Sequence, residues 1–168
     1  MEFDKVIRER CSIRRFTDRQ VEKEKLDKIL EAGNLAPTAK NNQPQRIYVI
    51  QSEEGLNKID EISKCRYHAP TVLIICSDLN EVYFDEAEGN TADIDASIVT
   101  THMMLEATNQ GVDNIWIDLF DHIKVKEVLN LPSNIKPVAM MPLGYRDNIG
   151  PSPLHNQRKN IEETVTYI

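Results

Sequence analysis

The stretch that most restricts the fold is Thr71–Cys76, an apolar run bounded by Pro70 on one side and Ser77-Asp78 on the other. A strand with one face in water alternates apolar and polar residues, whereas a strand covered on both faces is apolar throughout. We therefore predict that residues 71–76 form a strand buried on both faces of a sheet.

The periodicity of the remaining chain predicts one α+β domain over residues 1–168, a length that suits a single hydrophobic core. Apolar spacing predicts helices at 3–10, 22–33, 53–63, 93–110 and about 122–130, and further strands at 46–50, 112–117 and 136–145. Gly33 is expected to cap the second helix and Asp121 the fifth. The prolines of the last strand suit an edge or a strand end.

The helix at 93–110 has apolar residues around most of its circumference. A helix of this kind is expected to be buried nearly all round. In a chain of this size, a helix without a solvent face indicates an interface between subunits.

A basic stretch, Arg10-Cys11-Ser12-Ile13-Arg14-Arg15-Phe16, follows the first predicted helix. It runs against the general trend of a chain whose formal net charge is -7. Guanidinium groups fork onto phosphate oxygens, and a serine hydroxyl adds one more donor. Taken alone, the stretch is better explained as a solvated basic turn at the end of the first helix, so another part of the chain must supply the rest of any phosphate site.

Residues 35–44 combine two prolines, a threonine and three amide side chains in a segment with neither helix nor strand periodicity. One interpretation is a plain helix-to-strand connector, since Asn and Pro are ordinary loop residues. The density of amides favours a loop that holds something polar. A second basic pair, Arg158-Lys159, lies near the C-terminus.

Composition argues against several classes of protein. The acidic balance, without a basic stripe beyond the Arg10 region, argues against nucleic-acid binding. No apolar run approaches the length of a membrane span, and the N-terminus does not resemble a signal peptide. The three cysteines lack metal-type or redox-type spacing, which is typical of free thiols in the reducing cytoplasm.

Common catalytic signatures do not occur in the sequence. There is no Gly-x-Gly-x-x-Gly after a strand, no Walker loop, no Gly-x-Ser-x-Gly elbow and no zincin motif. The four histidines show no ligand pattern, so we expect no metal. A bound organic cofactor would explain the basic stretch, the amide-rich loop and the interface-like helix together.

In order along the chain, these motifs resemble the flavin-dependent nitroreductase family. The resemblance is carried by Arg10-x-Ser12-x-Arg14-x-Phe16, Ala36-Pro37-Thr38-Ala39-x-Asn41-x-Gln43-Pro44, Asp95-Ala96-Ser97-Ile98, Gly111 to Trp116, Leu129 to Pro132, Gly144-Tyr145 and Arg158 with Ile161-Glu162-Glu163. It implies a nitroreductase-like α+β fold with a central mixed, mostly antiparallel sheet flanked by helices. It also implies an intertwined homodimer with two FMN sites at the interface.

The resemblance assigns residues to the two ends of the flavin. At the phosphate end it implies Arg10, Ser12, Arg14 and Arg158. From the partner chain, it implies a loop along the flavin ring, represented by Pro37, Thr38 and Ala39, with polar positions at Asn41 and Gln43.

Two further positions follow from the resemblance. Backbone groups at about Asp118 and Leu119 would approach the flavin N5 atom. Lys64 is a candidate for the lysine that some members place near N1 and O2, by analogy. This chain departs from the family pattern at Thr38-Ala39, where a serine pair is common, and at Gln45, where an aromatic is usual. It also departs at Asp113-Asn114, where Leu-Gly is common.

The implied activity is a cytoplasmic oxidoreductase that uses NADH or NADPH to reduce nitroaromatics, quinones or similar small molecules through FMN. Hydride transfer itself needs no protein acid or base, so we name no catalytic residue. The alternatives are an FMN-binding carrier, sensor or flavin-processing protein, and a dimeric domain that has lost its flavin. The physiological acceptor and the role of the acidic segment 79–91 do not follow from the sequence.

Overall fold

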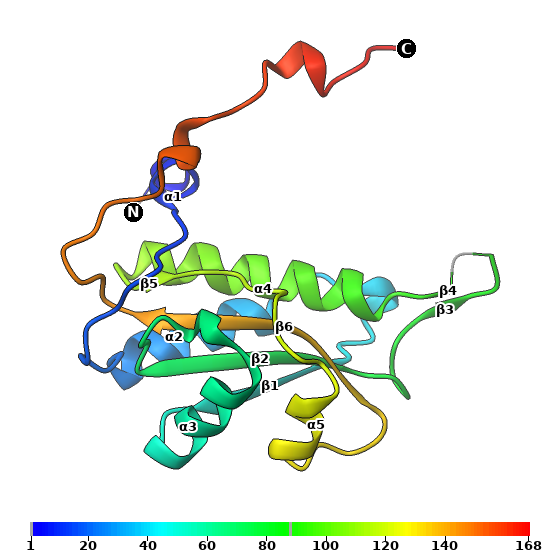
Figure 1. Ribbon diagram of the computed structural model, residues 1–168. Coiled ribbons are helices and arrows are strands. Elements are labelled where there is room, and N and C mark those ends of the chain that lie inside the picture. The colour runs from blue at the N-terminus through cyan, green and yellow to red at the C-terminus, as the bar shows by residue number, and fades with distance from the viewer. Residues whose placement is uncertain (1, 88) are drawn as a thin grey trace.

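An antiparallel sheet in the order β1-β2-β6-β5 forms the centre of the computed structural model, which describes residues 2–87 and 89–168 (Figure 1). The strands are β1 (Gln45–Ile50), β2 (Thr71–Asp78), β5 (Asp113–Asn114) and β6 (Ile135–Gly144). All three strand pairings are antiparallel, and the only parallel element in these residues is an isolated bridge between Ser12 and Asn114. Met1 and Glu88, an acidic residue of the predicted segment 79–91, lie outside the described residues.

The prediction of a strand buried on both faces is confirmed for β2. Its apolar residues from Val72 to Cys76 have no exposed surface. Leu73 and Ile75 join the core cluster that contains residues of α2 (Lys23–Asn34) and α4 (Ala92–Asn109). Val72, Ile74 and Cys76 face the opposite cluster, with residues of α3 (Glu53–Ile62) and α5 (Lys124–Val128). The alternation of side chains along a strand thus divides one apolar run between two cores.

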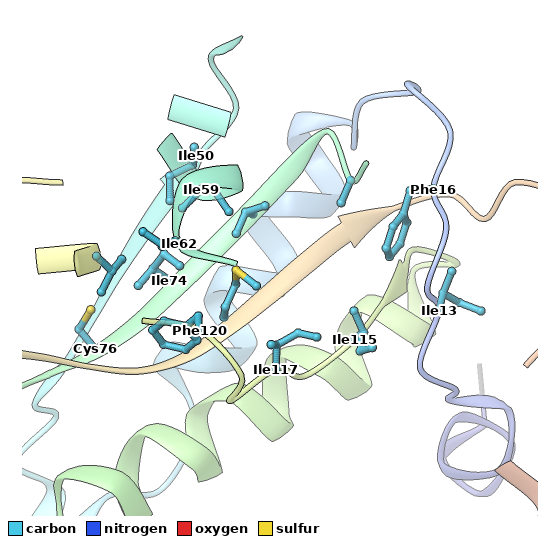
Figure 2. Close-up of a cluster of buried hydrophobic side chains, with 14 of the residues drawn as sticks. Ile13, Phe16, Ile50, Ile59, Ile62, Ile74, Cys76, Ile115, Ile117 and Phe120 are labelled. Carbon is cyan, nitrogen blue, oxygen red and sulfur yellow. The ribbon is translucent and has the colours of Figure 1, made fainter. Parts of the chain in front are cut away.

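The extended segment after α1 (Phe3–Glu9) is fixed by the second of these cores. Figure 2 shows Ile13 and Phe16 entering from this segment toward the cluster that also holds Ile115, Ile117 and Phe120. Ile13 is fully buried, and its N–H donates a 3.1 Å hydrogen bond to the carbonyl of Asn114. The position of the basic stretch is therefore set by apolar packing.

Helix α4 is partly exposed in the isolated chain, so the prediction of burial nearly all round is wrong for one subunit. One face is buried through Val99 and Met103, which pack over α2 and the sheet. The opposite side leaves Ile94 60% exposed and also exposes Thr101 and His102. Helix α1 lies against the C-terminal half of α4 (Figure 1).

Three local predictions need correction. Gly33 lies inside α2 and does not cap it; a Cβ atom there would be 2.8 Å from the side chain of Met103. The strand with prolines, β6, is not an edge strand, since it pairs with both β2 and β5; Pro137 and Pro142 lie near its two ends. The strand predicted at 112–117 is reduced to Asp113–Asn114, with one further bridge at Ile117.

The prediction for Asp121 is confirmed. Its carboxylate accepts hydrogen bonds from the N–H groups of Ile123 and Lys124 at the start of α5. In the described parts of the chain, no helix combines the length and apolar character that a membrane span requires.

Short elements complete the fold at its two ends. The 3₁₀ turn η1 (Ala39–Asn41) and the hairpin of β3 (Phe84–Asp85) and β4 (Gly89–Asn90) lie at the N-terminal end of α4 (Figure 1). The C-terminal tail, with η3 (Pro153–Asn156) and η4 (Ile161–Glu163), passes α1 and extends away from the sheet (Figure 1). The other short turn, η2 (Lys64–Arg66), follows α3.

Candidate functional site

The basic stretch presents its polar side chains on one side of an extended backbone. Cys11 and Ile13 are buried, at 7% and 0% exposure, while Ser12 is half-buried and Arg14 exposed. Neighbouring side chains in extended backbone point to opposite sides. Arg10, Ser12 and Arg14 therefore share the outward side.

These three residues line a hollow of about 220 Å³ together with residues of the C-terminal tail. The tail contributes Ser152, Leu154, His155 and Arg158. The structure therefore brings together the four side chains predicted to form one cluster, although Arg158 lies far along the chain from the others. Ser152 and His155 were not predicted, because nothing in the tail's sequence distinguishes them from ordinary turn residues.

The arginines of this hollow differ from all the others in the chain. Every other arginine forms an ion pair with a carboxylate: Arg8, Arg15, Arg19, Arg46, Arg66 and Arg146. Within residues 2–87 and 89–168, no carboxylate pairs with Arg10, Arg14 or Arg158. In a chain with net charge -7, three unpaired guanidiniums around one hollow form a site suited to an anion with several oxygens.

Two further hollows are connected to the first in sequence, each sharing lining residues with the one before it. Arg14 also lines a hollow of about 920 Å³, which reaches Ser63 and Lys64. Ser63 and Lys64 in turn line a hollow of about 330 Å³ that ends at Leu119. The shared residues give a path from the guanidinium cluster, past Lys64, to the loop that follows β5.

The loop at Asp118 and Leu119 is held to the end of α3. The hydroxyl of Ser63 donates a 2.8 Å hydrogen bond to the carbonyl of Leu119, and the N–H of Asp121 donates to the carbonyl of Ile62. No hydrogen bond in the described parts of the chain uses the N–H of Asp118 or Leu119. Both residues lie on the surface, and Leu119 is 78% exposed.

The wall of the 920 Å³ hollow contains backbone in an unusual conformation. Tyr67 and His68 both have positive φ, at 54° and 64°, and non-glycine residues adopt such angles at some cost in free energy. Burial is the main cause that raises the pKa of Tyr67, and a hydrogen bond with Cys65 raises it further. The nearby charge of Arg14 acts in the opposite direction. The phenol therefore stays neutral beside the guanidinium of Arg14.

The amide-rich loop is a separately built unit. The N–H of Ala39 donates a 2.9 Å hydrogen bond to the buried carboxylate of Asp95 in the first turns of α4. The N–H of Gln43 donates to the hydroxyl of Thr38 at 3.0 Å. Lys40, Asn41 and Gln43 have positive φ between 50° and 56°, so a sharply turned backbone presents an exposed surface at Pro37, Asn41 and Gln43.

Within one chain, this loop does not meet the guanidinium cluster. The loop is bound to Asp95, whereas Ser12 lies beside Asn114, whose amide contacts Met104 and Thr108 near the other end of α4. A rise of 1.5 Å per residue separates Asp95 from Thr108 by roughly 20 Å. Pro37, Thr38, Ala39, Asn41 and Gln43 therefore do not line the hollows of their own subunit.

The departure from the family pattern at Asp113 has a structural role. The Asp113 carboxylate accepts hydrogen bonds from Arg146, including one of 2.9 Å from Nε, and Asn114 is 2% exposed. The side-chain oxygens of Asn114 and Gln45 are buried without a partner in the described chain. The Asp113 contact ties the edge strand β5 to the residues after β6.

Comparison with known proteins gives one family. The family model described as "Nitroreductase family" matches residues 7–70 and 62–145. Among solved structures, a nitroreductase family protein from Clostridium difficile 630 is 39% identical, with a TM-score of 0.94, and the match covers 99% of this chain and 98% of that chain.

Two more distant matches extend over most of the chain. The FMN-dependent nitroreductase of Clostridium difficile R20291 is 26% identical with a TM-score of 0.74, covering 92% of this chain and 97% of that chain. A protein provisionally named NADH dehydrogenase/NAD(P)H nitroreductase, from Methanothermobacter thermautotrophicus, is 28% identical over 172 residues, covering 94% of this chain and 88% of the relative.

Proposed function

Because the chain belongs to the nitroreductase family, we propose that it is an FMN-dependent oxidoreductase that oxidises NADH or NADPH and reduces nitroaromatics, quinones or similar acceptors. Bound FMN would take up a hydride from the nicotinamide and deliver electrons to the acceptor. The protein supplies the binding and orientation of the flavin, its donor and its acceptor.

The observation that carries this proposal is the set of unpaired guanidiniums at Arg10, Arg14 and Arg158 around one hollow with Ser12. A phosphate monoester carries close to two negative charges at neutral pH and has three acceptor oxygens. Three guanidiniums and a hydroxyl satisfy this charge and these acceptors, so the residues present fit the phosphate of FMN.

The adjoining hollows support the same orientation for the rest of the flavin. They lead from Arg14 past Lys64 to Leu119, in the loop whose N–H groups at Asp118 and Leu119 make no hydrogen bond within the described chain. We assign Lys64 to the electron-rich edge of the ring, where its positive charge favours the reduced form. We assign the N–H groups of Asp118 and Leu119 as donors to the N5 atom of the flavin ring.

A two-fold symmetric dimer built on α4 explains where the amide-rich loop acts. Ile94, Ile98, Thr101 and Leu105 form a stripe at helical spacing along α4, in which Ile94 and Thr101 are exposed and Ile98 and Leu105 are half-buried. If a two-fold axis passes near the middle of this stripe, the α4 helices of the two subunits lie antiparallel. The N-terminal end of α4 in one subunit then lies beside the C-terminal end of α4 in the other. The loop at Pro37–Gln43 of one subunit then approaches the guanidinium cluster of the other, and the homodimer has two sites.

The first test is the absorption spectrum of the purified protein with added FMN. We expect a flavin spectrum, bleaching by NADH or NADPH without oxygen, and recovery on adding a quinone. A protein that binds no FMN contradicts the proposal, and one that binds FMN but is not bleached favours a carrier or sensor.

The second test addresses the phosphate site. Each charge-assisted contact contributes about 1.5–3 kcal/mol, so the double variant Arg10→Ala/Arg14→Ala should lose about a hundredfold or more in FMN affinity. Arg8→Ala is the matched control, since Arg8 pairs with Asp4 on the exposed side of α1. Equal FMN affinity in the double variant and the control means that the phosphate lies elsewhere.

A further inference from the structure

Tyr67 is joined to the basic stretch through its backbone. It follows the turn η2, and its carbonyl accepts a 3.1 Å hydrogen bond from the N–H of Phe16, two residues after Arg14. Phe16 is itself buried at 4% exposure, in the cluster shown in Figure 2. The contact places Tyr67 beside the basic stretch, and the position of Phe16 in the core fixes it there.

The side chain of Tyr67 contacts the same stretch at Arg14. Both side chains line the hollow of about 920 Å³, and the Tyr67 hydroxyl forms hydrogen bonds with the Arg14 guanidinium and the Cys65 thiol. A neutral phenol can accept one hydrogen bond and donate another, whereas a guanidinium only donates. The phenol oxygen therefore accepts from Arg14 while its proton is donated to the sulfur of Cys65.

Arg14 lies where two hollows meet. It lines the 220 Å³ hollow of the guanidinium cluster as well as the 920 Å³ hollow that contains Tyr67. A long side chain without a partner samples several rotamers, and ordering it on binding costs affinity. A hydroxyl that accepts from the guanidinium restricts these rotamers before any ligand arrives. Because the hydroxyl is neutral, it leaves the positive charge of Arg14 available, whereas a carboxylate would offset that charge.

From these contacts we infer that Tyr67 is a positioning residue, which holds the guanidinium of Arg14 in place for the flavin phosphate. The inference rests on the proposed function, in which Arg14 binds the phosphate of FMN. The Tyr67 hydroxyl acts on the flavin through Arg14, so it assists only a flavin that carries a phosphate. Tyr67 therefore favours FMN over riboflavin, which has the same ring system and no phosphate.

The dissociation constants of FMN and riboflavin, measured with the purified protein by quenching of flavin fluorescence, test the inference. Tyr67→Phe removes the hydroxyl and keeps the ring that packs against the core. Loss of one hydrogen bond of this kind should weaken FMN binding by about two- to tenfold, whereas riboflavin binding should not change. An equal loss for both flavins, or an unchanged affinity for FMN, overturns the inference.

A double-mutant cycle with Arg14→Ala separates positioning from packing. Without the guanidinium the hydroxyl has nothing to hold, so Tyr67→Phe should cause no further loss of FMN affinity in the Arg14→Ala background. Losses that simply add overturn the inference. Tyr48→Phe is the matched control, since Tyr48 is also half-buried against the same core cluster and is not among the described residues that line the three hollows. Both flavin affinities should be unchanged in this control.

The inference and the proposed function fail in different ways. If the wild-type protein binds no FMN, or if Arg14→Ala binds FMN as tightly as the wild type, the proposed phosphate site fails and the inference fails with it. If Arg14→Ala weakens FMN binding and Tyr67→Phe does not, the phosphate site stands and only the role of Tyr67 is overturned.

Discussion

The N–H of Ala39 donates a hydrogen bond to the carboxylate of Asp95, which links an exposed loop to a buried residue with 1% exposure. Thr91 donates to the second carboxylate oxygen. Asp95→Ala removes the acceptor for both donors. Hydrogen bonds to charged groups contribute about 1.5–3 kcal/mol, so we expect the free energy of unfolding to fall by about that amount or more.

The same substitution should weaken FMN binding, because the loop that the proposed function places beside the partner's flavin loses its anchor. Urea unfolding and flavin titration measure the two effects. Asp93→Ala is the control, since Asp93 forms an exposed pair with Lys136 at 2.7 Å, and such pairs contribute about 0–1 kcal/mol. Equal losses in Asp93→Ala and Asp95→Ala would contradict the anchoring role.

Gly33 is required by the close approach of α2 to α4. A Cβ atom at this position would lie 2.8 Å from Cγ and 2.9 Å from Sδ of Met103. Gly33→Ala should destabilise the fold by about 1–3 kcal/mol through overpacking. The better helix propensity of alanine offsets up to about 1 kcal/mol of this loss.

A double-mutant cycle with Met103→Ala isolates the steric part of this effect. Removing the methionine side chain should make Gly33→Ala neutral or stabilising in that background, as measured by denaturant unfolding. If the cost of Gly33→Ala is the same with and without Met103, the contact is not its cause.

A structural feature can be predicted from the sequence when its cause lies in neighbouring residues, and cannot when its cause is a contact between distant segments. The apolar run at Thr71–Cys76 predicts a central strand because burial on both faces leaves a direct mark on composition. The shared side of Arg10, Ser12 and Arg14 comes from extended backbone, which the sequence did not predict for this stretch. The position of Arg158 beside them depends on the path of the tail, and only the family resemblance predicts it.

Tertiary contacts explain the predictions that are wrong. Pro137 is tolerated in the central strand β6 because the register shifts opposite it, between Ile75 and Cys76. Pro142 still contributes its carbonyl, which accepts the N–H of Ile115 at 3.3 Å. Gly33 was expected to be a helix cap, and its partner Met103 is distant in sequence. No local pattern contains that information.

The carboxylate of Glu22 should make stability depend on pH in the acid range. A hydrogen bond from the hydroxyl of Tyr145, then one from Arg19, lowers the pKa of Glu22 from 4.5 to about 2. Because the folded-state pKa is depressed, this contribution is complete above the unfolded value of 4.5 and is lost as the pH falls toward about 2.

Glu22→Gln measures this contribution. Wild type should be more stable than Glu22→Gln in urea unfolding at about pH 6, and the difference should shrink as the pH falls from about 4.5 to about 2. Lys23→Gln, which removes an exposed pair with Asp27, supplies the matched control. A difference that stays constant over this range would show that Glu22 is not titrating with the depressed pKa.

The exposed stripe of α4 gives the sharpest test of the proposed dimer. Thr101 lies near the middle of the stripe, and its hydroxyl bonds only within the helix, to the carbonyl of Ser97. In a two-fold dimer, residues near the axis meet their own copies, so Thr101→Arg brings two positive charges together in the interface. We expect this variant to be a folded monomer that has lost most of its FMN affinity, since each site needs the partner's loop.

Thr101→Ala should remain dimeric and bind FMN normally. Sizing by light scattering, circular dichroism and flavin titration on the same samples separate the outcomes. A monomeric Thr101→Arg variant that keeps full FMN affinity would mean that the partner does not contribute to the site.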